Sequence, residues 1–225
     1  QAEFARDELG FPPDRVHVID FQVDDAFFTP GAGTSHEGVA CIGRELRDYP
    51  TLFDAVDGLD VPVTVVASSP WSRRRDQTQE HRIPGNVTLK KGLTSEELRD
   101  VYRNAALVVV PLQDVDSPAG ITSVLEAQAV GRPVVVSDTP GMRGAVEHGR
   151  NALTVPPGNA TALRRTITDL LSKPECAESL GQAGRETVRK SKTIEHYIAR
   201  ITAICRRAER STEERNRDEA DTTGR

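Results

Sequence analysis

The clearest candidate for a ligand-binding group is the turn that follows the apolar run Leu107–Leu112. It reads Ser-Pro-Ala-Gly-Ile-Thr-Ser and opens a second, amphipathic stretch. A strand that turns directly into a helix presents unpaired N–H groups and a partial positive charge, which suit a phosphate. Gly120 would let a ligand approach the backbone closely, while Thr122 and Ser123 add hydroxyl donors. The alternative is an ordinary strand-to-helix turn with a capping threonine.

Glu126 lies more than one turn into the same expected helix, within the run Val-Leu-Glu-Ala. A carboxylate among apolar neighbours costs free energy unless it has a partner. The hydroxyl pair of a ribose is a suitable partner, because a carboxylate accepts two hydrogen bonds. The alternative is a solvated helix face, and the small neighbours Ala127, Ala129 and Gly131 weigh against it.

Arg44 and Arg47 lie in the turn that follows another expected strand, Gly38–Gly43. Parallel strands of one sheet end at the same edge, and ligands bind outside that edge. Guanidinium groups there could neutralise a diphosphate. The alternative is a pair of surface arginines matched with Glu45 and Asp48.

A third basic group, Arg73–Arg75, lies in a polar loop that runs to Pro84. We expect a solvated, mobile loop, and contact with a ligand or with membrane phosphate is the alternative. His148 precedes a turn and is expected to be structural. The chain lacks a P-loop, a G-x-G-x-x-G after a strand, a G-x-S-x-G elbow and an H-E-x-x-H, which disfavours kinases, nicotinamide enzymes, hydrolases and zinc proteases.

Short Val- and Ile-rich runs alternate with longer amphipathic stretches, a pattern that predicts an α/β fold with a doubly wound parallel sheet. The expected strands are Arg15–Asp20, Gly38–Gly43, Val61–Ala67, Asn86–Lys90, Leu107–Leu112, Pro133–Ser137 and Ala152–Val155. The expected helices are Tyr49–Leu59, Ser95–Asn104, Ile121–Val130, Thr161–Ser172, Pro174–Ser191 and Thr193–Arg210.

The composition narrows the function. The net charge of -5 over 225 residues argues against nucleic acid as the main partner. The three cysteines form no close pair, which indicates a reducing compartment and no zinc site. No apolar run is long enough for a membrane span and no signal peptide is visible, so we expect a cytoplasmic protein, with peripheral contact to the inner face of the membrane as an option.

The two ends of the chain differ from its centre. The sequence starts at Gln1 within an apparent helix, which suggests that further sequence lies upstream. From Arg206 onward there are almost no apolar residues, so we expect a frayed helix end followed by disorder at 206–225. A charged, partner-binding tail is the alternative.

Several segments, in order, resemble the C-terminal domain of GT-B fold glycosyltransferases, specifically the retaining family 4. They are VIDFQVDDAFFTP, CIGRELRDYPTLFDAV, VTLKKGLTSEELRDVYRNAALVVVPL and GITSVLEAQAVGRPVVVSDTPGMRGAVEHGRNALTVPPGNATAL. The resemblance covers roughly residues 15–172. It implies a Rossmann-like domain at 31–205, joined through 1–30 to an N-terminal acceptor domain that is missing here.

The resemblance also implies roles for individual residues. Glu126 would be the second glutamate of the family's paired motif and would hold the donor ribose. The other implied contacts are Gly120, Ile121 and Thr122 with the diphosphate, Arg44 and Arg47 with phosphate oxygens, and the backbone around Lys91, Gly92 and Leu93 with the base. The first glutamate of the motif, which usually meets the donor sugar, is replaced by Pro118. Asp116 is the possible substitute.

The implied reaction is transfer of a sugar from a UDP- or GDP-sugar to an unknown acceptor, with retention and without an essential metal or other cofactor. The chain would supply the donor-binding half. A sugar-nucleotide epimerase of GT-B architecture is the competing enzyme. A non-catalytic nucleotide-sugar-binding module is the competing non-enzyme, and Pro118 makes it plausible.

Overall fold

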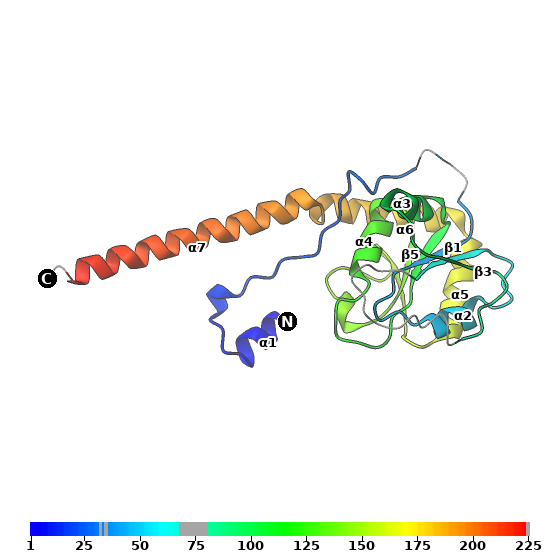
Figure 1. The fold of residues 1–225 in the computed structure, drawn as a ribbon, viewed down its shortest axis with the longest axis horizontal. Helices are drawn as coiled ribbons and strands as arrows, with labels where there is room; N and C mark the ends of the chain where they lie inside the picture. Colours follow the sequence, from blue (N-terminus) through cyan, green and yellow to red (C-terminus); the bar gives the residue numbers. More distant parts are fainter. Residues whose placement is uncertain (32, 34–35, 68–80, 224–225) are drawn as a thin grey trace.

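The computed structural model describes residues 1–31, 33, 36–67 and 81–223, with side chains described as far as Ser211. Figure 1 shows a compact sheet-and-helix body from which two arms extend, one from each end of the chain. The strands are β1 Val39–Ile42, β2 Val63–Val66, β3 Val87–Lys90, β4 Leu107–Val110, β5 Val134–Ser137 and β6 Leu153–Val155. The α-helices are α1 Ala2–Asp7, α2 Tyr49–Val56, α3 Ser95–Asn104, α4 Ile121–Ala129, α5 Ala160–Leu171, α6 Pro174–Ser191 and α7 Ile194–Thr223, with short 3₁₀ turns at Pro13–Arg15 and Pro140–Met142.

All six strands run parallel, in the order β3-β2-β1-β4-β5-β6. The prediction of an α/β, doubly wound parallel sheet with C-terminal helices is therefore confirmed. The first strand of the sheet, β1, lies at its centre. The next two strands are added outward to β3, and the chain then returns to place β4 on the other side of β1. The strand order reverses between β1 and β4, and this switch point is where such sheets leave a ligand crevice.

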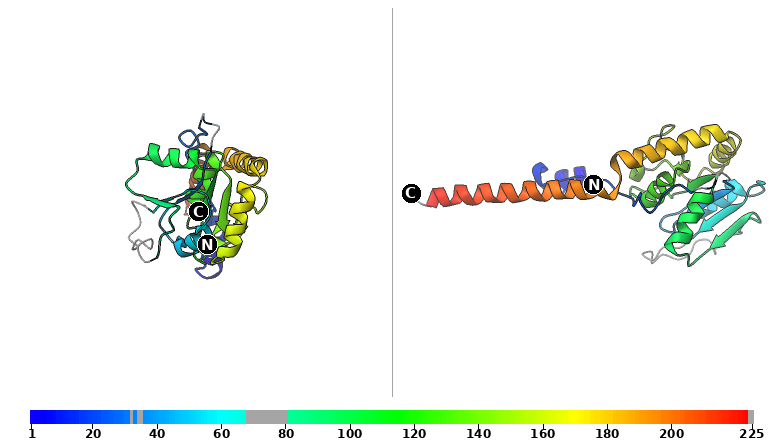
Figure 2. Two further views of the ribbon diagram at one scale, coloured as in Figure 1. Left: turned by 90° about the vertical axis from the view of Figure 1, so that its right-hand side faces the viewer. Right: turned by 90° about the horizontal axis from the view of Figure 1, so that it is seen from above.

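Helices cover both faces of the sheet, which explains why most strands are apolar on both sides (Figure 2). On one face α3 and α4 pack on a cluster that includes Val108 and Val134. On the other face α2 and α5 pack on a cluster that includes Cys41 and Val109. Helix α6 contacts both α4 and α5, so it closes the side of the body next to β5 and β6.

Side-chain caps fix the first residues of α3 and α5. The Thr94 side chain accepts a hydrogen bond from the Glu97 amide at 3.2 Å, and the Glu97 carboxylate accepts one from the Thr94 amide at 2.8 Å. This reciprocal capping box starts α3 at the predicted residue. Asn159 likewise caps α5, at 2.9 Å from the Ala162 amide.

The segment predicted as a first strand, Arg15–Asp20, is not a strand. It follows the 3₁₀ turn as extended chain, and the nearest β-type pairing is a single bridge between Val23 and Thr193. The carboxylate of Asp20 instead pairs with Lys192 at 3.2 Å and with Arg200 at 2.6 Å. Apolar alternation alone does not make a strand, because a strand also needs a neighbouring edge to pair with.

Helix α7 continues to Thr223, so the predicted fraying after Arg206 and the disordered tail are corrected to a helix. The segment from Arg206 onward is rich in Arg and Glu, which have high helix propensity. Figure 1 shows α7 extending away from the sheet, with the N-terminal arm running back in the same direction. The domain limits at 1–30, 31–205 and 206–225 stay predictions.

Candidate functional site

The turns that follow β1 and β4 are joined by backbone hydrogen bonds at the switch point. The Asp48 amide donates to the Pro111 carbonyl at 3.0 Å, and the Gln113 amide donates to the Leu46 carbonyl at 3.0 Å. The expectation that both turns lie at one edge of the sheet is therefore correct. Their residues meet at the edge of the sheet where the strand order predicts a ligand crevice.

Arg47 lies in the turn after β1 at this edge, with only 3% of its surface exposed. Its guanidinium donates to the Ile42 carbonyl at 3.1 and 2.9 Å, to the Glu45 carbonyl at 3.0 Å and to the Ser123 hydroxyl at 2.9 Å. Gly43 permits this position, because a Cβ there would collide with the guanidinium and its φ is +109°. The side chain is engaged with protein acceptors and ties the β1 turn to α4.

Gly120 begins α4 with φ +82°, in the left-handed region. A Cβ at this position would lie 2.9 Å from Val110, 3.0 Å from Leu112 and 3.1 Å from Arg47. Among the described residues, no side chain caps the helix. The Ile121 amide donates to the Pro118 carbonyl at 3.4 Å, which leaves the Thr122 and Ser123 amides for an external acceptor. Thr122 is exposed beside them. The predicted tight strand-to-helix turn is therefore present.

Glu126 is half-buried on α4, and its carboxylate faces Tyr102 on α3. The Tyr102 hydroxyl donates to Oε2 of Glu126 at 2.7 Å. Burial raises the pKa of Glu126 to about 7, against the opposing effects of this hydrogen bond and of the Arg47 charge. A carboxylate held at this cost can accept further hydrogen bonds from a ligand hydroxyl pair.

An open cleft of about 760 Å³ adjoins the N-terminal end of α4. Asp116, Pro118 and Ile121 line it on one side, together with the loop 140–145. The N-terminal arm lines the other side. Asp116 is exposed, so the structure places this carboxylate at the cleft without burying it.

The remaining predicted contacts lie elsewhere along the same edge. Arg44 is half-buried in the β1 turn beside Gly43. Gly92 follows β3 with φ +67° and is exposed. Leu93 packs against the core and lines a separate cleft of about 300 Å³ with Lys90. Residues 91–93 are thus not brought into the cleft that holds Asp116.

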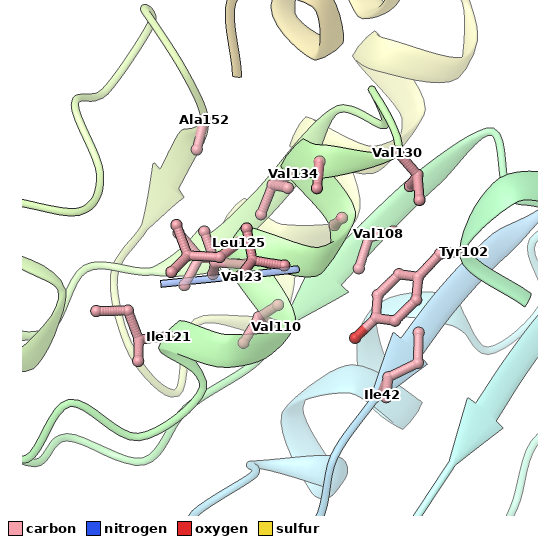
Figure 3. Close-up of a cluster of buried hydrophobic side chains, with 14 of the residues drawn as sticks. Val23, Ile42, Tyr102, Val108, Val110, Ile121, Leu125, Val130, Val134 and Ala152 are labelled. Carbon is pink, nitrogen blue, oxygen red and sulfur yellow. The ribbon is translucent and has the colours of Figure 1, made fainter. Parts of the chain in front are cut away.

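Tyr102 is the functional candidate that the sequence reasoning missed. It is fully buried in the apolar cluster drawn in Figure 3, alongside Val108 and Ile42. The available signal was its place four residues after Leu98 on the apolar face of α3. A buried tyrosine on such a face needs a hydrogen-bond partner, and the adjacent helix supplies Glu126.

The remaining predicted features concern metal binding, membrane contact, His148 and the basic group Arg73–Arg75. No group of metal-ligating side chains occurs among the described residues. Within the same part of the chain, no helix is long and apolar enough to cross a membrane. His148 accepts a hydrogen bond from the Thr154 amide at 3.0 Å, in keeping with a structural role. Arg73–Arg75 lie outside the described residues. The cytoplasmic location and the peripheral membrane contact stay predictions.

Comparison with known proteins now decides the family. Residues 54–187, more than half of the chain, match the family described as glycosyl transferases group 1. The chain belongs to this family. The matched region runs from the end of α2 into α6 and includes the β4 turn, α3 and α4.

Individual relatives agree with this assignment. The chain is 25% identical over 185 residues to glycogen synthase from Mycobacterium tuberculosis, covering 80% of this chain and 42% of that protein. Its fold matches the C-terminal domain of the group 1 glycosyl transferase LpcC from Francisella tularensis, with a TM-score of 0.64, 17% identity, and coverage of 76% of this chain and 99% of that one.

A second structure, Anabaena HepE in complex with UDP and glucose, has a TM-score of 0.74 at 15% identity. It is covered over 58% of its length by 87% of this chain. The chain spans less than half the length of the curated relatives that it matches first. The GT-B, Rossmann-like architecture expected from the sequence is therefore confirmed for one domain.

Proposed function

We propose that this chain is the nucleotide-sugar-binding half of a glycosyltransferase, acting on a UDP- or GDP-sugar. The observation that carries the proposal is the site at the switch point, where an uncapped helix N-terminus and a partly desolvated carboxylate lie less than two helical turns apart on α4. The first group suits a diphosphate and the second suits a ribose. Family membership supplies the sugar-transfer chemistry.

The diphosphate would lie over the turn formed by Gly120, Ile121 and Thr122. The amides of Thr122 and Ser123 and the positive end of the α4 dipole lie at this turn and would face the diphosphate. Arg44 would add a charge from the β1 turn. Arg47 would contribute its positive charge without direct contact, since its guanidinium is already bonded to carbonyl oxygens and to Ser123.

The rest of the donor would extend from this point in two directions. The ribose would bind Glu126, and the base would approach the backbone of Gly92 and Leu93 beyond β3. The sugar would enter the cleft lined by Asp116 and Pro118. HepE, which shares the fold, is known in complex with UDP and glucose, and this favours UDP as the first nucleotide to test.

Transfer also requires an acceptor held against the donor in a site that excludes water. The cleft beside α4 is open, and the N-terminal arm forms one of its walls. We infer that an N-terminal acceptor domain completes it in the full protein. The chain would contribute positioning of the donor and stabilisation of the leaving diphosphate.

The ribose assignment can be tested by calorimetric titration with UDP, GDP and 3′-deoxy-UDP. Glu126→Gln should weaken binding of the preferred nucleotide by about 10–100-fold, because a hydrogen bond to a charged acceptor is worth about 1.5–3 kcal/mol. The same variant should no longer discriminate against the deoxy analogue. Glu186→Gln, on an exposed position of α6, is the matched control. Equal affinity in wild type and Glu126→Gln would refute the assignment.

The half-enzyme proposal has a separate test. This chain, and a version extended upstream to the length of its relatives, would be assayed for product from radiolabelled donor sugars over lipid and carbohydrate acceptors. The extended version should transfer sugar and the present chain should not. Robust turnover by the present chain would show that no further domain is needed.

A non-catalytic binding module is the second candidate, because Pro118 stands where the resembling family has its sugar-contacting glutamate. Pro118 lies in the cleft wall and offers no side-chain acceptor, whereas Asp116 does. If Asp116 replaces the glutamate, Asp116→Asn in the extended version should lower turnover by at least about tenfold while nucleotide affinity is kept. Donor binding without any turnover in the extended wild type would favour the module.

A further inference from the structure

The hydroxyl of Tyr102 makes the only protein hydrogen bond to the Glu126 carboxylate within the described part of the chain. It donates to Oε2 at 2.7 Å, from a ring with no exposed surface. Oε1 keeps its acceptor sites for something else. The arrangement fixes one edge of the carboxylate and leaves the other edge available to a ligand.

The tyrosine ring is itself held firmly. Phe28 meets it edge to face, with ring centres 6.0 Å apart and planes at 84°. Phe28 belongs to the segment that enters the domain, and Arg103, adjacent to Tyr102, binds the Thr29 carbonyl at 2.7 Å and its hydroxyl at 2.6 Å. A ring packed on all sides presents its hydroxyl at one place.

We propose that Tyr102 is the positioning residue that holds the Glu126 carboxylate ready for the donor ribose, a role that rests on the proposed function. It acts through Glu126 and does not itself touch the donor. The entropy of orienting a half-buried glutamate is then lost on folding and not on binding, which strengthens donor binding. Because Phe28 packs against the ring, the same contact links the entering segment to the ribose site.

The second consequence concerns protonation. The Tyr102 hydrogen bond favours the ionised carboxylate, and burial opposes it. Removing the hydroxyl should therefore raise the pKa of Glu126 further. Ribose binding would then require a more alkaline solution, since the charged carboxylate is the stronger acceptor.

The test is UDP titration of four chains: wild type, Tyr102→Phe, Glu126→Gln and the double variant. Tyr102→Phe should weaken binding at pH 7 by about tenfold, the equivalent of about 1.4 kcal/mol. In the Glu126→Gln background the same change should cost less than about twofold, because two residues that act through one contact are not additive. Tyr197→Phe, on α7, is the control. GDP replaces UDP if it binds more tightly.

The Glu126 carboxyl titration, followed by ¹³C NMR without nucleotide, should move to higher pH in Tyr102→Phe. An unchanged Glu126 titration, or an equal loss of affinity in both backgrounds, would overturn the positioning role while leaving the ribose assignment intact. Unchanged affinity in Glu126→Gln would overturn both.

A measurement on the unaltered tyrosine covers the case in which Tyr102→Phe does not fold. A hydroxyl proton donated to a carboxylate gives a downfield NMR signal, and this signal should move upfield in Glu126→Gln. A Tyr102 hydroxyl signal that stays in place would contradict the contact and with it the proposal.

Discussion

The two turns that meet at the switch point carry charge in opposite ways. In the turn after β1, Arg47 is buried and donates four hydrogen bonds to three protein acceptors, Ile42, Glu45 and Ser123. On the helix after the β4 turn, Glu126 is half-buried and accepts one hydrogen bond from the residues that the structure describes. One charge is satisfied internally, and the other is left short of partners.

Under the proposed function, this contrast separates a structural charge, Arg47, from a charge proposed to bind the donor, Glu126, at the same edge of the sheet. Burying a charge is tolerated when hydrogen bonds replace the lost water, as they do around Arg47. Where they do not, the group keeps a free-energy cost that a ligand can relieve, and Glu126 shows this in its raised pKa. Residue type and position alone made Arg44 and Arg47 look equivalent, and the structure distinguishes them.

The largest expected effect comes from Arg47→Ala. The change removes the tie between the β1 turn and α4 and leaves buried acceptors unpaired. We expect a loss of about 3 kcal/mol in the free energy of unfolding, measured by urea denaturation. Arg150→Ala, at an exposed ion pair with Glu147, should cost less than about 0.5 kcal/mol. A stable Arg47→Ala protein with lost affinity only for diphosphates would reverse the comparison.

A slightly smaller effect, of opposite sign, is expected for Glu126→Gln. The pKa of Glu126 is about 7 in the folded chain and near 4.5 when unfolded. Well below pH 4.5 the carboxyl is neutral in both the folded and the unfolded chain, so burying it costs no free energy of desolvating a charge. Above pH 7 the carboxyl is charged in both the folded and the unfolded chain, so the full free-energy cost of burying the charge applies. Relative to wild type, the variant should therefore gain about 2–3 kcal/mol of stability between pH 4 and pH 8.

The measurement is urea denaturation of wild type and Glu126→Gln at several pH values, with Glu186→Gln as the control for loss of an exposed charge. The difference between wild type and Glu126→Gln should grow as pH rises. A difference that is constant with pH would mean that Glu126 is solvated in the folded chain, and the contrast with Arg47 would then disappear.

The smallest effect is expected for Arg44→Ala, which should leave stability within about 0.5 kcal/mol of wild type because the side chain is half-exposed. If Arg44 faces the diphosphate, affinity for UDP should fall by up to about tenfold, while affinity for uridine should stay constant. Calorimetric titration with both ligands checks this. Equal losses of affinity for UDP and for uridine would mean that Arg44, like Arg47, has a structural role in the turn after β1.

Local patterns were enough to predict the parallel sheet and most helix limits. Unbroken apolar runs such as Leu107–Val110 are typical of strands covered on both faces, and the Thr94–Glu97 capping box marks the first residue of α3. The same patterns failed at Arg15–Asp20 and after Arg206. Whether extended chain finds an edge to pair with, and whether a polar helix persists, is not encoded in apolar spacing.

The sequence by itself determined the fold class and the strand-to-helix turn at Gly120, because each depends on residues close together in the chain. The ligand-binding roles of Gly120 and Glu126 stay predictions. Tertiary structure decided which charges face the protein. Arg47 reaches Ser123 across 76 residues, and Tyr102 reaches Glu126 across 24. Such partners are set by how helices pack on the sheet, so spacing along the chain does not reveal them.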